Sequence, residues 1–302
     1  MAPQAIGTDS QFTPQTGRRV EATREIRRER LKMFGLTVPA LVMVTLFLGV
    51  PVAWLFGLSF YEDGQFTARH FTRMLEDSSY SRSLWLTVQI SVAVTAFAMI
   101  VGYPVSYVLS QLPRRWAAIG LTFVVIPFWT SLLVRTYAWL ILLQRKGVVN
   151  DALMSIGIID EPLYLVHNVT GTIIGMSHIM LPFLILPLYA NMKRIDLSLV
   201  KAAHSLGASP TFAFWTVYFP LSLPGFLAGA LLVFVLSVGF YITPAILGGG
   251  RTIMISMLIE RNVNLFFEWG AASSVAIVFL AVVLGIFWIL NRFLAVERLM
   301  GE

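Results

Sequence analysis

The chain has 302 residues, of which 57% are apolar and only 13% are charged, and its mean hydropathy is +0.76. Soluble domains carry about 25% charged residues, so this composition offers too little polar surface to enclose a water-soluble core. The net charge is +6, and the absence of cysteine excludes disulfides, thiolate metal sites and cysteine nucleophiles. The composition therefore indicates a polytopic membrane protein.

Residues 1–32 are rich in charge and lack the apolar segment of a signal peptide, so we predict a cytoplasmic N-terminal tail. Long, almost uncharged runs then predict six transmembrane helices, at about 34–60, 84–111, 117–143, 169–191, 220–246 and 270–291. A helix needs about 20 mostly apolar residues to cross the hydrocarbon core. The runs do not alternate between apolar and polar residues, which disfavours a β-barrel. The predicted fold class is all-α, with residues 33–302 forming one transmembrane domain.

The distribution of basic residues predicts the orientation. Most lysines and arginines fall in the N-terminal tail and in the loops after the second, fourth and sixth predicted helices. Basic loops are retained on the cytoplasmic side of the membrane. We therefore predict that both chain termini are cytoplasmic.

The segment 196–219, between the fourth and fifth predicted spans, has the pattern of two short helices. Asp196 suits an N-cap, Gly207 a C-terminal stop, and Ser209 a second N-cap before Pro210. Pro220 is expected to mark the turn into the next span. Apolar residues fall at helical spacing, namely Ile195, Leu199, Ala202, Ala203 and Leu206. By pattern alone, this hairpin is either a cytoplasmic docking element or an amphipathic hairpin lying on the lipid.

The same segment resembles the cytoplasmic "EAA" loop of the permease subunits of bacterial ABC importers. That loop reads Glu-Ala-Ala, three residues, Gly, nine residues, then Ile-x-Leu-Pro. Here Lys201-Ala202-Ala203 precedes Gly207 by three residues, and nine more residues lead to Val217-Tyr218-Phe219-Pro220. Lys201 stands where the family has Glu. The resemblance implies a type I ABC importer permease fold with a coupling helix hairpin, whose ATPase-coupling residues are Lys201, Ala202, Ala203, Gly207, Ala208 and Pro220.

Further segments are similar to the spermidine/putrescine permeases, namely 127–137, 146–150, 181–189 and 269–272. This similarity implies a subunit that forms half of a polyamine pathway in the bacterial inner membrane. The implied partners are a second homologous permease in a heterodimer, a cytoplasmic ABC ATPase dimer and a periplasmic solute-binding protein, with no nucleic acid. The alternatives are an ABC permease for an opine or amino-acid derivative, and an ion-coupled secondary transporter.

No nucleotide-binding or catalytic motif accompanies these features. The Gly248-Gly249-Gly250 stretch lacks the lysine and the spacing of a phosphate-binding loop. We therefore expect a non-catalytic subunit without a cofactor of its own, with ATP and Mg²⁺ bound by the partner ATPase. An intramembrane enzyme would need a catalytic constellation, and a plain membrane anchor would not need the patterned 196–219 segment.

Candidates for the substrate pathway are aromatic and acidic side chains, because both pair with ammonium groups. They are Trp129, Tyr137, Trp139, Tyr241, Glu260 and Glu268. The alternatives are membrane packing for the aromatic residues, and docking of a binding protein or simple solvation for the acids. Arg135 is the charge inside a predicted span, and it either gates the pathway or caps helix carbonyls. The four histidines have no ligand spacing, so no metal site is expected.

Overall fold

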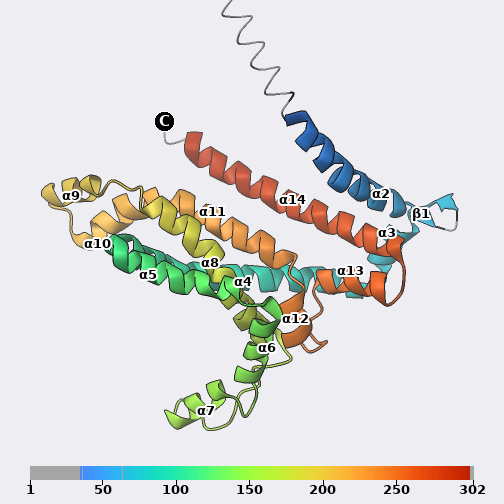
Figure 1. The fold of residues 1–302 in the computed structure, drawn as a ribbon, viewed down its shortest axis with the longest axis horizontal. Coiled ribbons are helices and arrows are strands. Elements are labelled where there is room, and N and C mark those ends of the chain that lie inside the picture. The colour runs from blue at the N-terminus through green and yellow to red at the C-terminus, as the bar shows by residue number, and fades with distance from the viewer. Residues whose placement is uncertain (1–34, 36, 63, 300–302) are drawn as a thin grey trace, which may run out of the picture. The chain divides into compact units, whose positions relative to one another are not determined.

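In the computed structural model of the chain, residue 35, residues 37–62 and residues 64–299 are described, with side chains described up to Trp288 (Figure 1). The predicted tail 1–32 therefore lies outside the described residues. Two compact units are present, Met1–Gly57 and Leu58–Glu302. The described residues include five helices long and apolar enough to cross a membrane, or six when a bent helix pair is counted as one span. The chain is thus an all-α polytopic membrane protein.

Apart from residue 35, the described part of the first unit is the helix Thr37–Leu58, whose last residue belongs to the second unit. It passes through a π-helical turn, η1 (Thr45–Gly49), into α2 (Val50–Leu58). Pro51 explains the wide turn, because a proline has no N–H to donate and its ring crowds the carbonyl four residues earlier. The N–H of Val50 instead donates to the carbonyl of Thr45.

The second unit is built on three long helices, α4 (Ser78–Gln111), α8 (Val169–Met192) and α11 (Phe219–Val238). Their shared core buries apolar side chains from all three, including Ile90, Val94, Met176, Met180, Leu184 and Val233. The helices approach closely at glycines, as the four-residue glycine spacing favours. A Cβ on Gly229 of α11 would lie 3.0 Å from the carbonyl oxygen of Leu184 on α8.

Helix α4 begins at Ser78, several residues before the predicted start at 84. The carboxylate of Asp77 accepts the N–H of Ser79 at 2.8 Å and so caps the additional turn. This hydrogen bond holds the pKa of Asp77 below its usual value.

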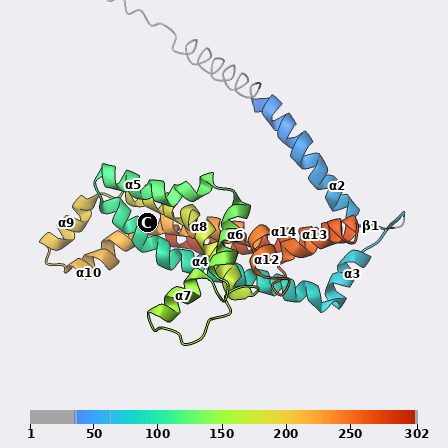
Figure 2. The ribbon, with the colours of Figure 1, turned by 60° about the horizontal axis from the view of Figure 1, so that its bottom comes forward.

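The third predicted span, 117–143, is not one straight helix. Helix α5 (Arg114–Val125) and the 3₁₀ turn η2 (Ile126–Trp129) are bent by 99° from α6 (Leu132–Leu142). The break follows from Pro127 in the 3₁₀ turn and from extended backbone at Thr130 and Ser131. Beyond α6 lies the short helix α7 (Val148–Ser155), visible with the bend in Figure 2.

The fifth predicted span, 220–246, also differs from the structure. One continuous helix runs from Pro210 to Val238, through α10 (Pro210–Ala213), the π-turn η3 (Phe214–Tyr218) and α11. Pro220 therefore lies within a helix and does not mark a turn, because the π-turn before it makes room for its ring. The helix ends at Val238 with Gly239 as its C-cap, and α12 (Ile242–Leu247) is a separate short helix.

The remaining elements lie toward the end of the core where α4 starts. A two-residue hairpin, β1 (Tyr61–Glu62) and β2 (Gln65–Phe66), pairs Tyr61 with Phe66 and precedes α3 (Arg69–Glu76). Helix α13 (Ile255–Asn264) is joined to α4 by the N–H of Ile255, which donates to Thr87 Oγ1 at 2.8 Å. Helix α14 (Trp269–Leu299) packs on α13 and α3.

Candidate coupling site and transport pathway

The segment 196–219 forms a helical hairpin whose ends are capped as predicted. Helix α9 (Leu197–Ser205) starts at Asp196, whose carboxylate accepts the N–H of Ser198 at 2.9 Å. This bond lowers the pKa of the exposed Asp196 carboxyl. The second N-cap, Ser209, accepts the N–H of Phe212 at 3.3 Å. The capping predictions for both helices are thus confirmed.

Gly207 closes α9 in the left-handed conformation, with φ = +89°. Its N–H donates to the carbonyl of His204, and the N–H of Ala208 donates to the carbonyl of Ala203, at 2.9 and 3.0 Å. These two bonds make a Schellman motif, which fixes the angle between the helix and the following chain. The ring of His204 adds a contact of 3.0 Å from Nδ1 to the carbonyl of Ala208. The turn between α9 and α10 is therefore rigid.

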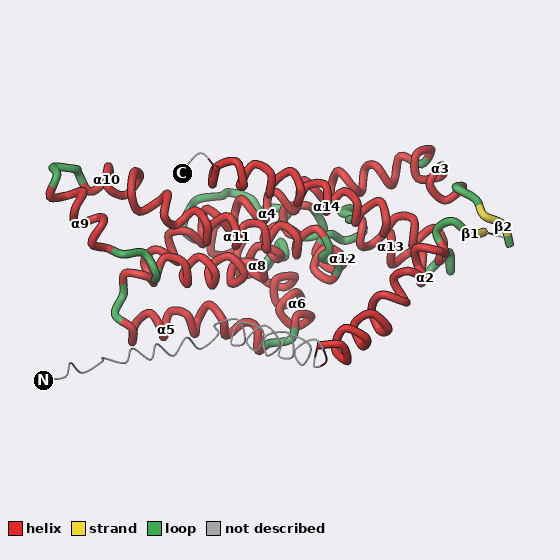
Figure 3. Tube along the Cα trace, turned by 90° about the horizontal axis from the view of Figure 1, so that it is seen from above, coloured by secondary structure: helices red, strands yellow, loops and turns green. Residues whose placement is uncertain are grey.

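The hairpin protrudes beyond the ends of the core helices (Figures 1 and 3). Its outer face is apolar and exposed, with Leu206 at 89%, Phe212 at 62% and Trp215 at 59% exposure. Lys201 and Ala202 are also exposed. The helical spacing of Leu199 and Leu206 does not reflect burial in this chain, because Ile195 and Val200 are the residues that pack inward.

The hairpin rests on an aromatic cluster at the end of α4 and α8. The cluster buries Leu188, Met192 and Tyr218 against Tyr103, Tyr107, Ile195, Val200, Phe214 and Phe226. The rings of Tyr107 and Tyr218 meet edge to face with centroids 5.2 Å apart, and those of Tyr103 and Phe226 at 5.4 Å. Such ring pairs add about 0.5–1.5 kcal/mol each beyond their burial. The hairpin is therefore firmly seated on the membrane core.

The structure does not gather the aromatic pathway candidates into one site. Trp129 is 87% exposed at the α5–α6 bend, and Tyr137 lies exposed on α6. Trp139 packs inward, where its indole N–H donates to His178 Nδ1 on α8 at 3.2 Å. Tyr241 occupies the N-cap position of α12, and its side chain makes no capping hydrogen bond. Among the described residues, no hydrogen bond or ring contact joins any two of these four side chains.

The acidic candidates both lie near α13 and α14 and both have neighbours. Glu268 forms an ion pair of 2.6 Å with Arg73 of α3, so it is not a free carboxylate. Glu260 accepts a hydrogen bond of 3.2 Å from Asn264. The guanidinium of Arg135 lies 3.4 Å from the carbonyl of Thr130 at the α5–α6 bend. This contact favours carbonyl capping over a gate for Arg135.

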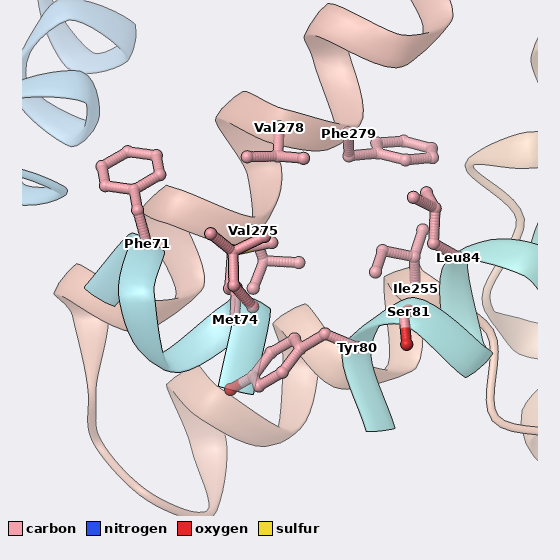
Figure 4. A pocket seen from close by; sticks show the side chains of 10 residues that line it. Phe71, Met74, Tyr80, Ser81, Leu84, Ile255, Val275, Val278 and Phe279 are labelled. Carbon is pink, nitrogen blue, oxygen red and sulfur yellow. The ribbon is translucent and has the colours of Figure 1, made fainter. Parts of the chain in front are cut away.

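Two cavities of the second unit are apolar. One of about 320 Å³ lies between α3, α4, α13 and α14 (Figure 4). Tyr80, Leu84, Ile255, Val275 and Phe279 point into it. A second, of about 500 Å³, lies among α4, α11 and α14. Neither has a charged lining residue, so neither suits a polycation.

Sequence reasoning missed the polar groups that join the hairpin to α4, namely Ser110, Lys193 and Tyr218. A signal for them exists in the sequence. Polar atoms recur at Tyr103, Tyr107 and Ser110, which share one face near the end of an otherwise apolar run. His178, the partner of Trp139, carried no comparable signal.

Comparison with known proteins identifies the family. Residues 101–295 match the family model described as "Binding-protein-dependent transport system inner membrane component". The chain is 31% identical over 261 residues to the spermidine/putrescine transport system permease protein PotB of Escherichia coli (strain K12), covering 83% of this chain and 94% of that protein. It is 26% identical to the putative 2-aminoethylphosphonate transport system permease protein PhnU of Salmonella paratyphi A, covering 84% and 89%.

A solved structure has the same fold. A chain of a bacterial ABC transporter involved in the import of the acidic polysaccharide alginate superposes with a TM-score of 0.70 at 18% identity, covering 90% of this chain and 98% of that one. This chain belongs to the family of inner membrane components of binding-protein-dependent transport systems, and it is a multi-pass, non-catalytic permease subunit of an ABC importer.

Proposed function

We propose that this permease subunit forms half of the translocation pathway of a polyamine importer, with spermidine or putrescine as cargo. The observation that carries the proposal is the similarity to PotB, which extends over nearly the whole of that protein. The second permease subunit would be a homologue, so that the pathway lies in a heterodimer. A periplasmic solute-binding protein would deliver the cargo.

In this proposal the exposed α9–α10 hairpin docks on a cytoplasmic ATPase, which binds ATP and Mg²⁺. The coupling residues are the exposed Lys201 and Ala202, together with Ala203, Gly207, Ala208 and Pro220. A rigid turn suits this role better than a flexible tether, because it transmits displacement as a rigid-body movement. The exposed apolar side chains of the hairpin provide the surface that a partner would cover.

The proposed orientation places the hairpin and both termini in the cytoplasm. Basic residues gather at the hairpin end of the second unit, where Lys193, Arg194 and Lys201 lie with Arg114 and Arg115. The hydrogen bond from Lys193 to the carbonyl of Ser110 places the basic residues after α8 and those after α4 at the same end of the unit. Clustered basic residues beside transmembrane helices favour the cytoplasmic side.

Uptake by the reconstituted complex tests the cargo. The permease pair, the ATPase and the binding protein are incorporated into liposomes that carry ATP inside, and entry of labelled spermidine is measured. We expect ATP-dependent uptake that excess putrescine inhibits and excess 2-aminoethylphosphonate does not. If 2-aminoethylphosphonate inhibits and putrescine does not, the cargo belongs to the aminophosphonates and not to the polyamines. The putative 2-aminoethylphosphonate permease PhnU, at 26% identity, makes this the alternative to test.

The path through the membrane stays a prediction, with Trp139 and Tyr241 as its aromatic candidates on this subunit. Trp139 lies on α6 and Tyr241 directly precedes α12, and each of these short helices follows a break. These helices are joined by Thr136 and Thr243, whose hydroxyl oxygens are 3.3 Å apart. Discontinuous helices often bear the substrate contacts of transporters, because the break frees backbone groups for a ligand.

A further inference from the structure

Both roots of the hairpin make hydrogen bonds to one residue of α4. On the outgoing side, Lys193 at the end of α8 donates from Nζ to the carbonyl of Ser110 at 2.9 Å. On the returning side, the hydroxyl of Tyr218 lies 3.0 Å from Ser110 Oγ. The chain between them contains both helices of the hairpin, α9 and α10. Ser110 therefore lies where the two roots converge.

The direction of the bonds at Ser110 can be deduced. Its hydroxyl donates to the carbonyl of Tyr107 at 2.7 Å, which uses its only proton. The hydroxyl of Tyr218 must then donate to Ser110 Oγ, and it accepts from Gln111 Nε2 at 3.2 Å. Tyr218 is 3% exposed, so its hydroxyl relies on these partners. Removing the hydroxyl removes a defined donor.

The hydrogen bond from Lys193 Nζ to the carbonyl of Ser110 lies at the C-terminal end of α4. Ser110 and Gln111 are the last residues of α4, whose final carbonyls have no partner within the helix. A lysine ammonium placed there satisfies a carbonyl and also interacts favourably with the negative end of the helix dipole. Lys193 thus fixes the end of α4 to the end of α8.

Helix α4 extends from this point to the opposite end of the core. Pro104 lies inside it and removes one backbone hydrogen bond, six residues before Ser110. The ring of Tyr103, just before Pro104, contacts Phe214 of the hairpin root. At the far end, Thr87 accepts the N–H of Ile255 on α13. Ser110, after Pro104, is thus bonded to both hairpin roots, whereas Thr87, before Pro104, is bonded to α13.

We propose that Ser110 is the point at which movement of the hairpin enters the membrane core, and that Lys193 and Tyr218 are positioning residues that couple ATP hydrolysis to transport. The inference rests on the proposed docking of the hairpin on an ATPase. In this arrangement the end of α4 moves with the hairpin, and Pro104 is the place where α4 bends.

The test uses the complete reconstituted importer and measures cargo imported per ATP hydrolysed. The variants are Tyr218→Phe and Lys193→Met, alone and combined. Tyr189→Phe on α8 and Lys146→Met are matched controls, because no hydrogen bond of either side chain occurs among the described residues. The yield and thermal stability of the purified complex are measured for every variant.

We expect each single variant to lower the import-to-hydrolysis ratio about three- to tenfold, the range that one net hydrogen bond represents, while ATP hydrolysis and complex yield persist. The double variant should depart from the product of the single effects, since both bonds end on Ser110. The controls should match the unaltered importer.

An unchanged ratio in both single variants would overturn the inference. So would equal losses of import and hydrolysis that follow a loss of complex yield, because the bonds would then be only structural. Either result leaves the proposed function standing if a cysteine placed on the hairpin still cross-links to the ATPase. If the hairpin cysteine does not cross-link to the ATPase even with Lys193 and Tyr218 intact, the proposed function is contradicted instead.

Discussion

At the scale of single residues, the coupling hairpin depends on backbone conformation more than on side-chain chemistry. Gly207 has φ = +89°, and a Cβ added to it would meet nothing within 4 Å. A substitution there is therefore strained without being crowded. The left-handed region costs other residues about 1–2 kcal/mol, with Asn and Asp the most tolerant.

We predict that Gly207→Val lowers transport strongly while membrane insertion and complex yield persist, because the valine moves α9 out of its docking angle. Gly207→Pro should be at least as severe, since it also removes the N–H that bonds His204. The matched control is Gly157→Val, at φ = +72° and also in open space but outside the hairpin. Transport assays on the three variants check this, and equal losses at positions 157 and 207 would contradict it.

The cap at Asp196 gives a pH-dependent prediction. Its lowered pKa means that the carboxylate is the form that binds the Ser198 N–H. The stabilisation is therefore complete above the ordinary aspartate pKa of about 3.9 and is lost as pH falls through the lower folded value. Asp196 therefore stays ionised from neutral pH down to its lowered pKa, and over this range the hydrogen-exchange protection of residues 197–200 should not change. Asp196→Ala should speed exchange at neutral pH, while Asp196→Asn should not.

At the scale of elements, patterns of charge and hydropathy predicted which segments are helical, but not where helices break. The caps at Asp196, Gly207 and Ser209 follow from local chemistry, so the sequence predicts them. The span expected at 117–143 stays a prediction, since the bent pair α5–α6 can count as one span. Its 99° bend depends on backbone angles at Thr130 and Ser131, for which hydropathy carries no signal. The turn expected at Pro220 is wrong because a π-turn absorbs the proline.

The contact between α8 and α11 provides an element-scale prediction. A Cβ on Gly225 would overlap the side chain of Asn191, whereas one on Gly285 of α14 would meet nothing within 4 Å. Overpacking costs about 1–3 kcal/mol. Gly225→Ala should therefore lower the thermal unfolding temperature of the purified complex by several degrees, and Gly285→Ala should leave it unchanged. Equal midpoints for the two variants would show that α8 and α11 are not closely packed.

At the scale of the whole molecule, the sequence predicted the fold class, because membrane insertion demands long apolar runs. It also predicted the helical hairpin and its position between two long helices, because the hairpin has a spacing pattern. The convergence of Lys193 and Tyr218 on Ser110 was not, since it joins residues more than eighty positions apart. The pathway candidates were chosen by side-chain type alone, and the structure distributes them over η2, α6, the start of α12, α13 and the α13–α14 turn.

The proposed orientation can be tested by labelling single introduced cysteines. The chain has no native cysteine, so the label reports only the introduced position. A cysteine at Ala202, exposed on α9, should react with an impermeant thiol reagent only from the cytoplasmic side. A cysteine at Ile158, which is 66% exposed beyond α7, should react only from the opposite side. The reverse pattern would invert the topology.

The central claim is that the hairpin receives movement from a separate ATPase. The most direct measurement is cross-linking of Ala202→Cys to cysteines on the purified ATPase, within the assembled complex, with and without ATP. We predict a cross-link whose yield changes when ATP is added. A cysteine at Ile158 should give no more cross-link than the cysteine-free chain. A hairpin cysteine that reacts with lipid-soluble reagents and never with the ATPase would contradict the account.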